Sequence, residues 1–213
     1  MGTESSARTT NCVRTLPVGD PGEPRRTAID ELTELARQPW TMRVGHQPVV
    51  VRPSTVRDLA AVAQMHRRCS ARSLLDRYRS GGRAPAVAAV DHLLRNPLTF
   101  VVATNDNRIV ATASLQRDPA HNFRCAEASL LVEDGWQRRG VGGDLLTHLA
   151  GVAQVAGFTE LIAYPATAIP AAQRLMIEVG RTRMVPDVDA HLHTYLPDEA
   201  TLGLGSVRQR LAG

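Results

Sequence analysis

Three glycines stand within four residues in the segment VEDGWQRRGVGGDLLTHLA, which covers residues 132–150. A helical pattern begins directly after them, although glycine costs a helix about 1 kcal/mol per residue relative to alanine. Unpaired backbone N–H groups at a helix start, together with the helix dipole, form a site for phosphate. Glycine lets the backbone approach an anion closely and adopt positive φ where required. The stretch from Arg139 to Gly143 could therefore hold a pyrophosphate.

Other phosphate-binding motifs do not fit this segment. The chain contains no lysine, so a Walker loop with its phosphate-binding lysine is excluded. Gly140, Gly142 and Gly143 lack the final spacing of the G-x-G-x-x-G motif, and no acidic residue ends a following strand in the dinucleotide-binding manner. The simpler alternative is architectural: the glycines only make a tight strand-to-helix turn, and no cofactor binds.

Positive charge is unevenly distributed along the chain. All 25 basic residues are arginine, and eight of them fall between Arg52 and Arg83 against two acidic residues. Such a run is typical of a solvated helix face, and it could also attract an anionic ligand. No aromatic platform or nucleic-acid motif accompanies it, so we expect no nucleic-acid partner.

Length and composition predict one domain of ordinary size. No apolar run is long enough to span a membrane, and the N-terminus lacks the layout of a signal peptide. Cys12, Cys69 and Cys125 form neither a disulfide framework nor a zinc pattern. We expect a cytoplasmic protein with reduced thiols and no membrane partner, acting as a monomer or a homodimer.

Hydrophobic periodicity and turn residues predict the elements that position the glycine segment. We expect an N-terminal extension over 1–45, partly disordered with a short helix at 28–38, a domain over 46–197 and a tail over 198–213. The order of the predicted elements favours an α+β (mixed α/β) fold with one sheet covered by helices. They are strands at 48–54, 98–104, 109–116, 126–133, 159–165, 182–186 and 190–197, and helices at 59–66, 70–80, 86–96, 141–156 and 169–179.

The segment QRRGVG at 137–142 resembles the Q/R-x-x-G-x-G/A motif of the GNAT superfamily of N-acetyltransferases. It has the preceding strand AEASLLVE and the following amphipathic helix of that family, and the likeness extends over most of residues 49–195. The segment MHRRCSARSLLDRY is similar to the first-helix region of GNAT domains in bacterial protein lysine acetyltransferases. The resemblance implies a mostly antiparallel sheet of six to seven strands, splayed at the cofactor site, and acetyl-CoA as cosubstrate.

The resemblance also implies how the cofactor lies. Its pyrophosphate would rest on backbone amides of the glycine loop. Its pantetheine arm would pair like an extra strand with the motif strand, in the split that separates this strand from the one at 159–165. The implied cofactor-binding residues are Leu130, Leu131, Val132, Gln137, Arg138, Arg139, Gly140, Val141, Gly142 and Gly143.

Acyl transfer needs a neutral amine, hence a base, and a donor for the oxyanion. Glu127 lies on the motif strand where some GNATs carry a catalytic glutamate; the alternative is an ordinary strand-surface carboxylate. The tyrosine that many GNATs place four residues before the glycine closing the last helix is replaced by Met176, ahead of Gly180. Tyr164 is the candidate substitute as general acid, although some members of the family are thought to work without one.

The resemblance implies direct attack by a primary amine in a ternary complex. The acceptor is left open between a small molecule and a protein lysine. Arg68 and Arg72 are expected to border the acceptor cleft, where they would suit an acceptor bearing carboxylate or phosphate. The alternative function, motivated by the missing tyrosine, is a non-catalytic acyl-CoA-binding regulatory protein.

Two histidines on the last predicted strand raise the question of a metal. His191 and His193 are two residues apart, so they face the same side of the strand. No third ligand stands at a diagnostic spacing from them, and we expect no metal site.

Overall fold

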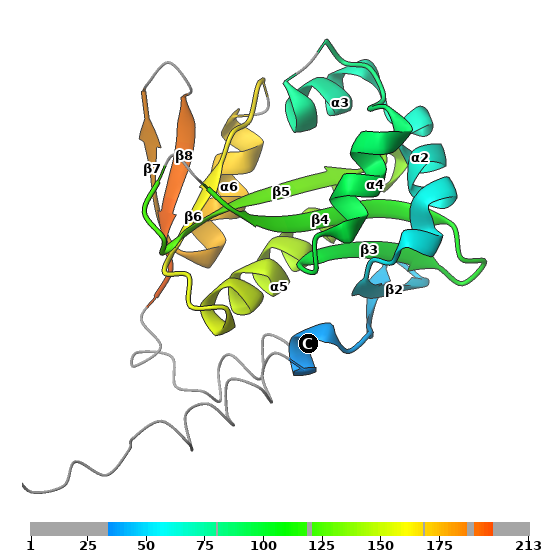
Figure 1. Ribbon diagram of the computed structural model, residues 1–213, viewed down its shortest axis with the longest axis horizontal. Coiled ribbons are helices and arrows are strands. Elements are labelled where there is room, and N and C mark those ends of the chain that lie inside the picture. Colours follow the sequence, from blue (N-terminus) through cyan, green and yellow to red (C-terminus); the bar gives the residue numbers. More distant parts are fainter. Residues whose placement is uncertain (1–33, 80, 119–120, 168, 187–189, 198–213) are drawn as a thin grey trace, which may run out of the picture.

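A sheet of eight strands forms the centre of the described chain, which comprises residues 34–79, 81–118, 121–167, 169–186 and 190–197 of a computed structural model (Figure 1). The strand order is β1-β2-β3-β4-β5-β6-β8-β7. Neighbouring strands run antiparallel except β5 and β6, which are parallel. The strands are β1 (Trp40–Val44), β2 (Gln47–Pro53), β3 (Thr99–Thr104), β4 (Ile109–Arg117), β5 (Cys125–Val132), β6 (Glu160–Ala163), β7 (Arg181–Val185) and β8 (His191–Tyr195).

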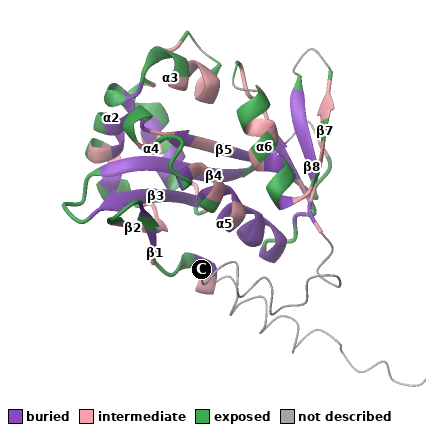
Figure 2. Ribbon diagram, turned by 180° about the vertical axis from the view of Figure 1, so that it is seen from behind, coloured by how far each residue is buried: buried purple, intermediate pink, exposed green. Residues whose placement is uncertain are grey.

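Helices cover both faces of this sheet, which confirms the predicted α+β (mixed α/β) class. β3 is buried at every position, and its residues alternate between two apolar clusters. Phe100 and Val102 pack in the cluster that contains α5, whereas Val101 and Ala103 pack with α2 and α4. Figure 2 shows the strands largely buried between the helices. The helices are α2 (Leu59–Arg68), α3 (Ala71–Tyr78), α4 (Val87–Arg95), α5 (Val141–Val155) and α6 (Ile169–Val179).

The strand β1 is the part of the sheet that the sequence did not predict. It pairs with β2 from Trp40↔Val51 to Val44↔Gln47, across a turn in which Gly45 has a φ of +64°. The sheet therefore has more than the expected six to seven strands and begins before residue 46. Only Met42 and Val44 of β1 are buried, so five residues carry too short an alternation to identify a strand.

The bounds of the other strands and of α2 to α6 differ from the expected ones by at most two residues at either end. Residues 34–37 are helical, and the rest of the helix expected at 28–38 lies partly outside the described residues. Residues 1–33 of the expected N-terminal extension and the expected tail at 198–213 also lie outside the described residues. No helix in the described part of the chain combines the length and apolarity needed to cross a membrane.

The start of α2 is fixed by a polar cluster around Asp58. A short 3-10 helix, η1 (Val56–Asp58), precedes it, and the Thr55 backbone N–H donates to Asp58 Oδ2 at 2.8 Å. These contacts form a capping box at the helix start. Arg52 on β2 donates to both carboxylate oxygens at 2.8 and 2.7 Å. Burial raises the pKa of Asp58, but the hydrogen bonds from Arg52 and Thr55 outweigh it, so the pKa lies below its ordinary value.

The parallel junction between β5 and β6 is short. Cα partners are Cys125↔Glu160, Ala126↔Leu161 and Glu127↔Ile162, and the pairing ends there. Beyond it β5 continues to Val132 along β4 only, while β6 ends at Ala163 and keeps β8 as its other neighbour. The sheet is therefore splayed beyond Glu127, as the resemblance implied.

Candidate active site

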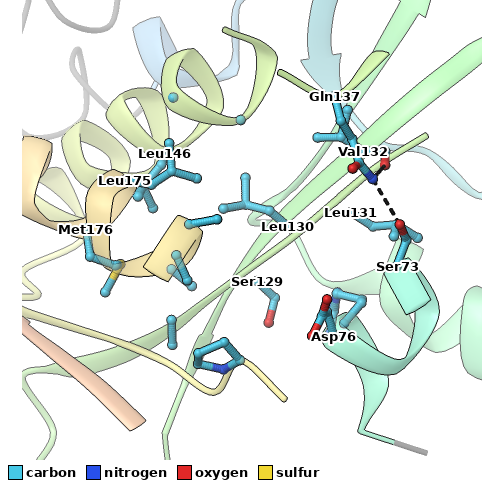
Figure 3. Close-up of a pocket in the computed structure, with 18 of the residues that line it drawn as sticks. Ser73, Asp76, Ser129, Leu130, Leu131, Val132, Gln137, Leu146, Leu175 and Met176 are labelled. Carbon is cyan, nitrogen blue, oxygen red and sulfur yellow. Dashed lines mark hydrogen bonds between the residues drawn. The ribbon is translucent and has the colours of Figure 1, made fainter. Parts of the chain in front are cut away.

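A cleft of about 1100 Å³ opens where β5 and β6 separate. β5 lines it from Glu127 to Val132, and α3, the glycine loop, the start of α5, α6 and the end of β6 with the loop after it line the rest. Figure 3 shows Leu130 of β5 between Ser73 and Asp76 on the α3 side and Leu175 and Met176 on the α6 side. A cleft of this size between the open edge of a strand and a helix start can take a long, flexible ligand with an anionic group.

The structure brings most of the expected cofactor residues to this cleft. Two side chains point elsewhere. Val141 is 1% exposed and belongs to the core, and the Arg139 guanidinium lies 5.9 Å from the centre of the Trp136 ring, beside the β1–β2 turn. Those that line the cleft are Leu130, Leu131, Val132, Gln137, Arg138, Gly140, Gly142 and Gly143.

The glycine loop leads into α5 with its first backbone N–H groups available. Gly140 is the N-cap, with a φ of +90° that requires glycine, and the first intrahelical bond runs from the Asp144 N–H to the Gly140 carbonyl at 3.1 Å. The N–H groups of Val141, Gly142 and Gly143 precede that bond and have no acceptor within the helix.

Gly142 and Gly143 are not required by the packing of the fold. A Cβ at Gly142 would lie 3.5 Å from Leu175, and one at Gly143 would lie 3.5 Å from Glu178, which are ordinary contacts. Neither residue has positive φ. The fold would tolerate alanine at both positions, so these glycines fit a role in which a ligand approaches the backbone.

Carboxylates as well as arginines border this anion site. Arg138 and Arg174 line the cleft together with Glu178. Asp144 lies in the first turn of α5, and burial, followed by the charge of Glu178, raises its pKa. Positive charge at the glycine loop is therefore partly offset by two acids on neighbouring helices.

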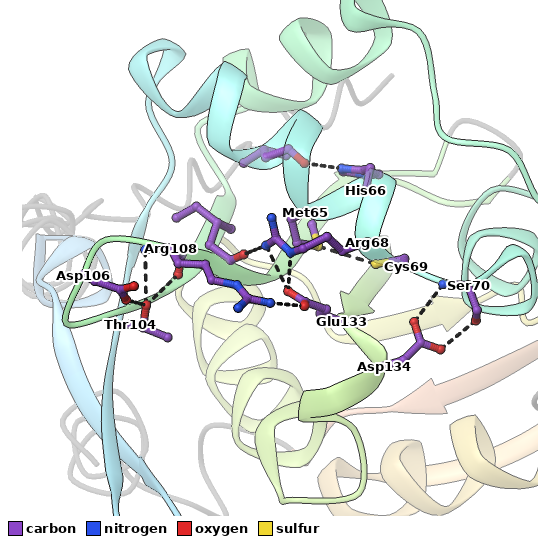
Figure 4. A network of polar contacts seen from close by, with 12 residues as sticks. Met65, His66, Arg68, Cys69, Ser70, Thr104, Asp106, Arg108, Glu133 and Asp134 are labelled. Atoms are coloured by element: carbon purple, nitrogen blue, oxygen red, sulfur yellow. Dashed lines mark hydrogen bonds and ion pairs between the residues drawn. The ribbon is translucent and has the colours of Figure 1, made fainter.

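The helix α3 is fastened to the loop that precedes the glycines (Figure 4). Asp134, in the 3-10 helix η2 (Asp134–Trp136), accepts from the Ser70 N–H at 2.8 Å and from the Ser70 and Ser73 hydroxyls at 2.6 and 3.0 Å. Gln137 Nε2 donates to Ser73 Oγ and to the Val132 carbonyl, both at 2.9 Å. Sequence reasoning did not select the two serines; the N-cap preference for serine was the available signal.

Arg68 is not part of the cleft, contrary to the expectation from sequence. Its guanidinium contacts Glu133 at 2.9 Å and donates to the Ile109 carbonyl at 2.7 Å, and Arg108 also pairs with Glu133 (Figure 4). Glu133 is only 7% exposed, and a buried carboxylate needs cationic partners. Arg72, the other residue named for this role, does line the cleft.

Glu127 lies at the last β5–β6 rung and lines the cleft in a half-buried position. Ser129 Oγ donates to Glu127 Oε1 at 2.8 Å. The two residues are two apart on one strand and so share a face, the signal by which Ser129 could have been found. The bond orients the carboxylate and leaves its second oxygen to accept a proton.

Tyr164 follows β6 and lines the same cleft, with its hydroxyl donating to Asp118 Oδ2 at 2.6 Å. Burial raises the pKa of Tyr164, and so do the hydrogen bond and charge of Asp118 and the charge of Glu127. Asp118, the residue after β4, was not selected from sequence. Met176 on α6 is 2% exposed and presents an apolar wall to the cleft.

A further contact joins α3 to the loop after β6. Asp76 Oδ1 accepts from the Thr167 N–H at 2.6 Å and from its hydroxyl at 2.7 Å. Three arginines line the same region: Arg72, Arg77 and Arg79.

A family model described as "Acetyltransferase (GNAT) family" matches residues 62–179, more than half of the chain. No curated protein matches this chain. Among solved structures, the chain is similar to the GNAT domain of S. lividans PAT, with 21% identity over 74% of this chain and 97% of that one and a TM-score of 0.66. It is also similar to yncA from Salmonella typhimurium, which was solved with its cofactor acetyl-CoA. The identity is 19% over 70% of this chain and 95% of that one, and the TM-score is 0.56.

A third similar structure is a cAMP-binding acyltransferase from Mycobacterium smegmatis. It shares 22% identity over 86% of this chain, with a TM-score of 0.53, and the match covers 59% of that protein. At such identities these likenesses establish the fold alone.

Proposed function

Because the chain belongs to the acetyltransferase (GNAT) family, we propose that it transfers the acetyl group of acetyl-CoA to a primary amine. The observation that most supports this function is the three-residue β5–β6 junction, which leaves the edge of β5 open beside the glycine loop. An amide-containing arm can pair with such an edge like an added strand. The bound cosubstrate supplies an activated thioester, and the protein supplies position, a base and a proton donor.

The glycine loop and β5 hold the donor in this proposal. The N–H groups of Val141, Gly142 and Gly143 point from the start of α5 and suit a pyrophosphate. Arg138 adds positive charge beside them. Residues 130–132 offer their backbone to the arm, and a backbone N–H of β5 donates to the developing oxyanion.

Glu127 is the proposed base. An amine attacks a thioester only after losing its proton, so the base must lie where the donor and the acceptor meet. In this proposal that place is the end of the β5–β6 pairing, from which the two strands diverge. Glu127 occupies that position, and the Ser129 hydroxyl fixes one of its oxygens. The other oxygen takes the proton directly or through one water.

Tyr164 is the proposed acid for the departing thiolate. Its raised pKa keeps the hydroxyl protonated at neutral pH, so a proton is available. In the structure that proton is donated to Asp118. Tyr164 acts by turning its O–H from Asp118 toward the sulfur, while Met176 contributes no proton in the position where many relatives carry tyrosine.

The acceptor proposed is an amine that also carries a carboxylate or phosphate. Arg72, Arg77 and Arg79 line the α3 side of the cleft. Their charge attracts an anionic group and holds the amine end of the same molecule toward Glu127.

The test is thiol release from acetyl-CoA with a panel of amines, chosen in pairs that differ only by a carboxylate or phosphate. Glu127→Gln is expected to lower kcat by about 100-fold or more, as the loss of a general base does, while acetyl-CoA affinity stays within about twofold. Asp91→Asn removes an acid on α4 that pairs with Arg95 outside the cleft, and serves as the matched control. An unchanged rate in Glu127→Gln would exclude it as the base.

A second candidate function is a non-catalytic acyl-CoA-binding regulator. It is favoured by the apolar Met176 wall and by the engagement of Tyr164 with Asp118. It predicts tight acetyl-CoA binding in calorimetry with no amine-dependent thiol release by the wild type. Acceptor-dependent release that Glu127→Gln abolishes would reject it.

A further inference from the structure

Cys125, Glu160 and His193 come together on one face of the sheet, on β5, β6 and β8. Cys125 and Glu160 are partners in the β5–β6 register, and Glu160 is the partner of Tyr195. His193 is two residues from Tyr195, so its side chain shares that face. The Cys125 sulfur, a Glu160 carboxylate oxygen and a His193 ring nitrogen all lie within 4.8 Å of one another.

This cluster joins His193, one of the two histidines on the last predicted strand, to two other ligand types. Cys125 and Glu160 stand far from His193 along the chain, and only the strand order β5-β6-β8 makes them neighbours (Figure 1). Three adjacent paired strands give the ligands a rigid frame, which a metal site requires.

The chemistry of the three groups fits zinc. Cysteine, histidine and carboxylate are its usual ligands, and a soft thiolate disfavours magnesium and calcium. Cys125 is fully buried and His193 is 7% exposed. One thiolate and one carboxylate neutralise a divalent cation, so the occupied site carries no net charge into the interior, where an unbalanced charge is costly.

Further polar groups surround these three. The rings of His121 and His191 lie 6.0 and 6.1 Å from that of His193 between centroids, and His121 Nδ1 lies 3.1 Å from Asp118 Oδ2. His193 Nε2 is already 2.7 Å from Glu160 Oε2. A fourth ligand can therefore come from a neighbouring imidazole or from water, and zinc sites of three protein ligands and one water are well known.

We propose that Cys125, Glu160 and His193 form a zinc-binding site that clamps β5, β6 and β8 together at the β5–β6 junction. The site begins at the first of the three β5–β6 rungs, and Glu127 stands at the last. Zinc therefore holds the strands just before they part. Without a cation the thiol keeps its proton, because burial and then the charges of Glu160 and Asp118 raise the pKa of Cys125 to about 12. Binding releases that proton.

Cobalt titration tests this site in a form that does not depend on acetyl transfer. The protein is the full, untagged chain carrying Cys12→Ser and Cys69→Ser, so that Cys125 is its one thiol. One equivalent of Co²⁺, added under argon, is expected to give a near-ultraviolet thiolate-to-cobalt band and the intense visible bands of a tetrahedral site. Zinc is expected to displace the cobalt and remove both.

Variants assign the ligands. Adding Cys125→Ser should abolish the near-ultraviolet band, and His193→Ala should weaken cobalt affinity at least about tenfold. His92→Ala is the matched control, an exposed histidine on α4, and should change nothing. Should His193→Ala fail to fold, as judged by circular dichroism, Glu160→Gln is the second variant and should also lose at least about tenfold in affinity.

Thermal unfolding gives an independent measurement. Zinc should raise Tm for the Cys12→Ser, Cys69→Ser protein and not for the variant that also carries Cys125→Ser. The proposal is overturned if no thiolate band forms, if the band survives Cys125→Ser, or if His92→Ala and His193→Ala bind cobalt equally. None of these results bears on acetyl transfer, which is tested by Glu127→Gln.

Discussion

At the scale of one residue, Gly142 is a position where the packing of the fold would accept a small side chain but ligand binding would not accept a long one. Its Cβ position is 3.5 Å from Leu175 Cδ1, so a methyl group fits, whereas a longer side chain would extend into the cleft that the residue lines. Gly140, two residues earlier, is constrained differently, because its φ of +90° is itself unfavourable for any other residue.

Gly142→Glu is expected to lower acetyl-CoA affinity by about 100-fold, or about 2.7 kcal/mol, because it places a carboxylate where the pyrophosphate is proposed to lie. Gly142→Ala is the matched control and should bind within a few-fold of the wild type. Isothermal titration calorimetry measures both. Equal affinities in the Glu variant and the wild type would remove the glycine loop from the donor site.

Tyr164→Phe tests the acid. For a group that acts in its protonated form, a raised pKa extends activity to higher pH; the wild-type kcat should therefore show no loss from Tyr164 ionisation up to about pH 10, its ordinary pKa. The Phe variant should lower kcat roughly tenfold with unchanged acetyl-CoA affinity. A kcat-against-pH profile identical to that of the wild type would restrict Tyr164 to supporting Asp118.

The sequence predicted the place of site residues that lie within one continuous segment. It did not predict the place of residues whose partners are distant in the sequence. Glu127 and the glycines follow from one strand–loop–helix segment, and the structure lines the cleft with them. Arg68 was misplaced because its partner, Glu133, is buried by packing that no local pattern encodes. Gln137 was expected at the cofactor, and its amide in fact also bonds Ser73 on a distant helix.

The N-terminal turn of α3 is held by a carboxylate outside the helix. Asp134 accepts from Ser70, the N-cap of α3, and from Ser73 in its first turn. Through these bonds the helix that carries Arg72 and Asp76 is tied to the loop that carries the glycines. Together with the bond from Gln137 to Ser73, these contacts link the α3 side of the cleft to the glycine-loop side.

Asp134→Asn is expected to lower the free energy of unfolding by about 1 kcal/mol at pH 7, a small figure because solvent screens this exposed group. Burial raises the pKa of Asp134, but the hydrogen bonds from Ser70 and Ser73 outweigh it and the pKa lies below its ordinary value. A lowered folded pKa means that its contribution is present above the unfolded pKa, near 3.9, and is lost as pH falls through the lower folded value.

Urea unfolding of wild type and Asp134→Asn at several pH values measures this. The difference in unfolding free energy should be constant between about pH 5 and 8 and should shrink below about pH 4. A difference that persists undiminished in acid would assign the effect to packing rather than charge.

Most elements followed from sequence because each has a long apolar pattern or a clear stop signal. β3 and β4 flank an Asn/Asp turn, and α5 ends before Gly157. β1 was missed because it is a short edge strand with two buried residues. The grouping of Cys125, Glu160 and His193 was missed for a different reason: strand order, which no single segment specifies, creates it.

At the scale of the whole molecule, the sheet divides into two halves, β1–β5 and β6–β8. Three paired residues along β5 and β6 join the halves. Helices α5 and α6 back them on one side and share an apolar cluster. A donor that lies between the open edges would connect both halves. Binding energy and folding stability are then coupled at this junction.

Acetyl-CoA at 100 times its Kd is expected to raise the free energy of unfolding by about 2.7 kcal/mol. For a domain of this size the corresponding increase in Tm is roughly 5–10 °C. Differential scanning fluorimetry measures it. Gly142→Glu at the same concentration, which would then be near its own Kd, should gain only about 0.4 kcal/mol, or roughly 1 °C in Tm. A wild-type Tm independent of acetyl-CoA would contradict the proposed donor site.

The brevity of the β5–β6 junction, three paired residues, also has a consequence for how long this protein would persist in a cell. Segments held by few bonds open locally more often, and proteases cut chains in such open states. If acetyl-CoA binds between the half-sheets as proposed, the occupied cleft would oppose this opening when acetyl groups are plentiful. When they are scarce, the emptied cleft would leave the chain more open to cleavage, so the amount of enzyme would follow the supply of what it consumes.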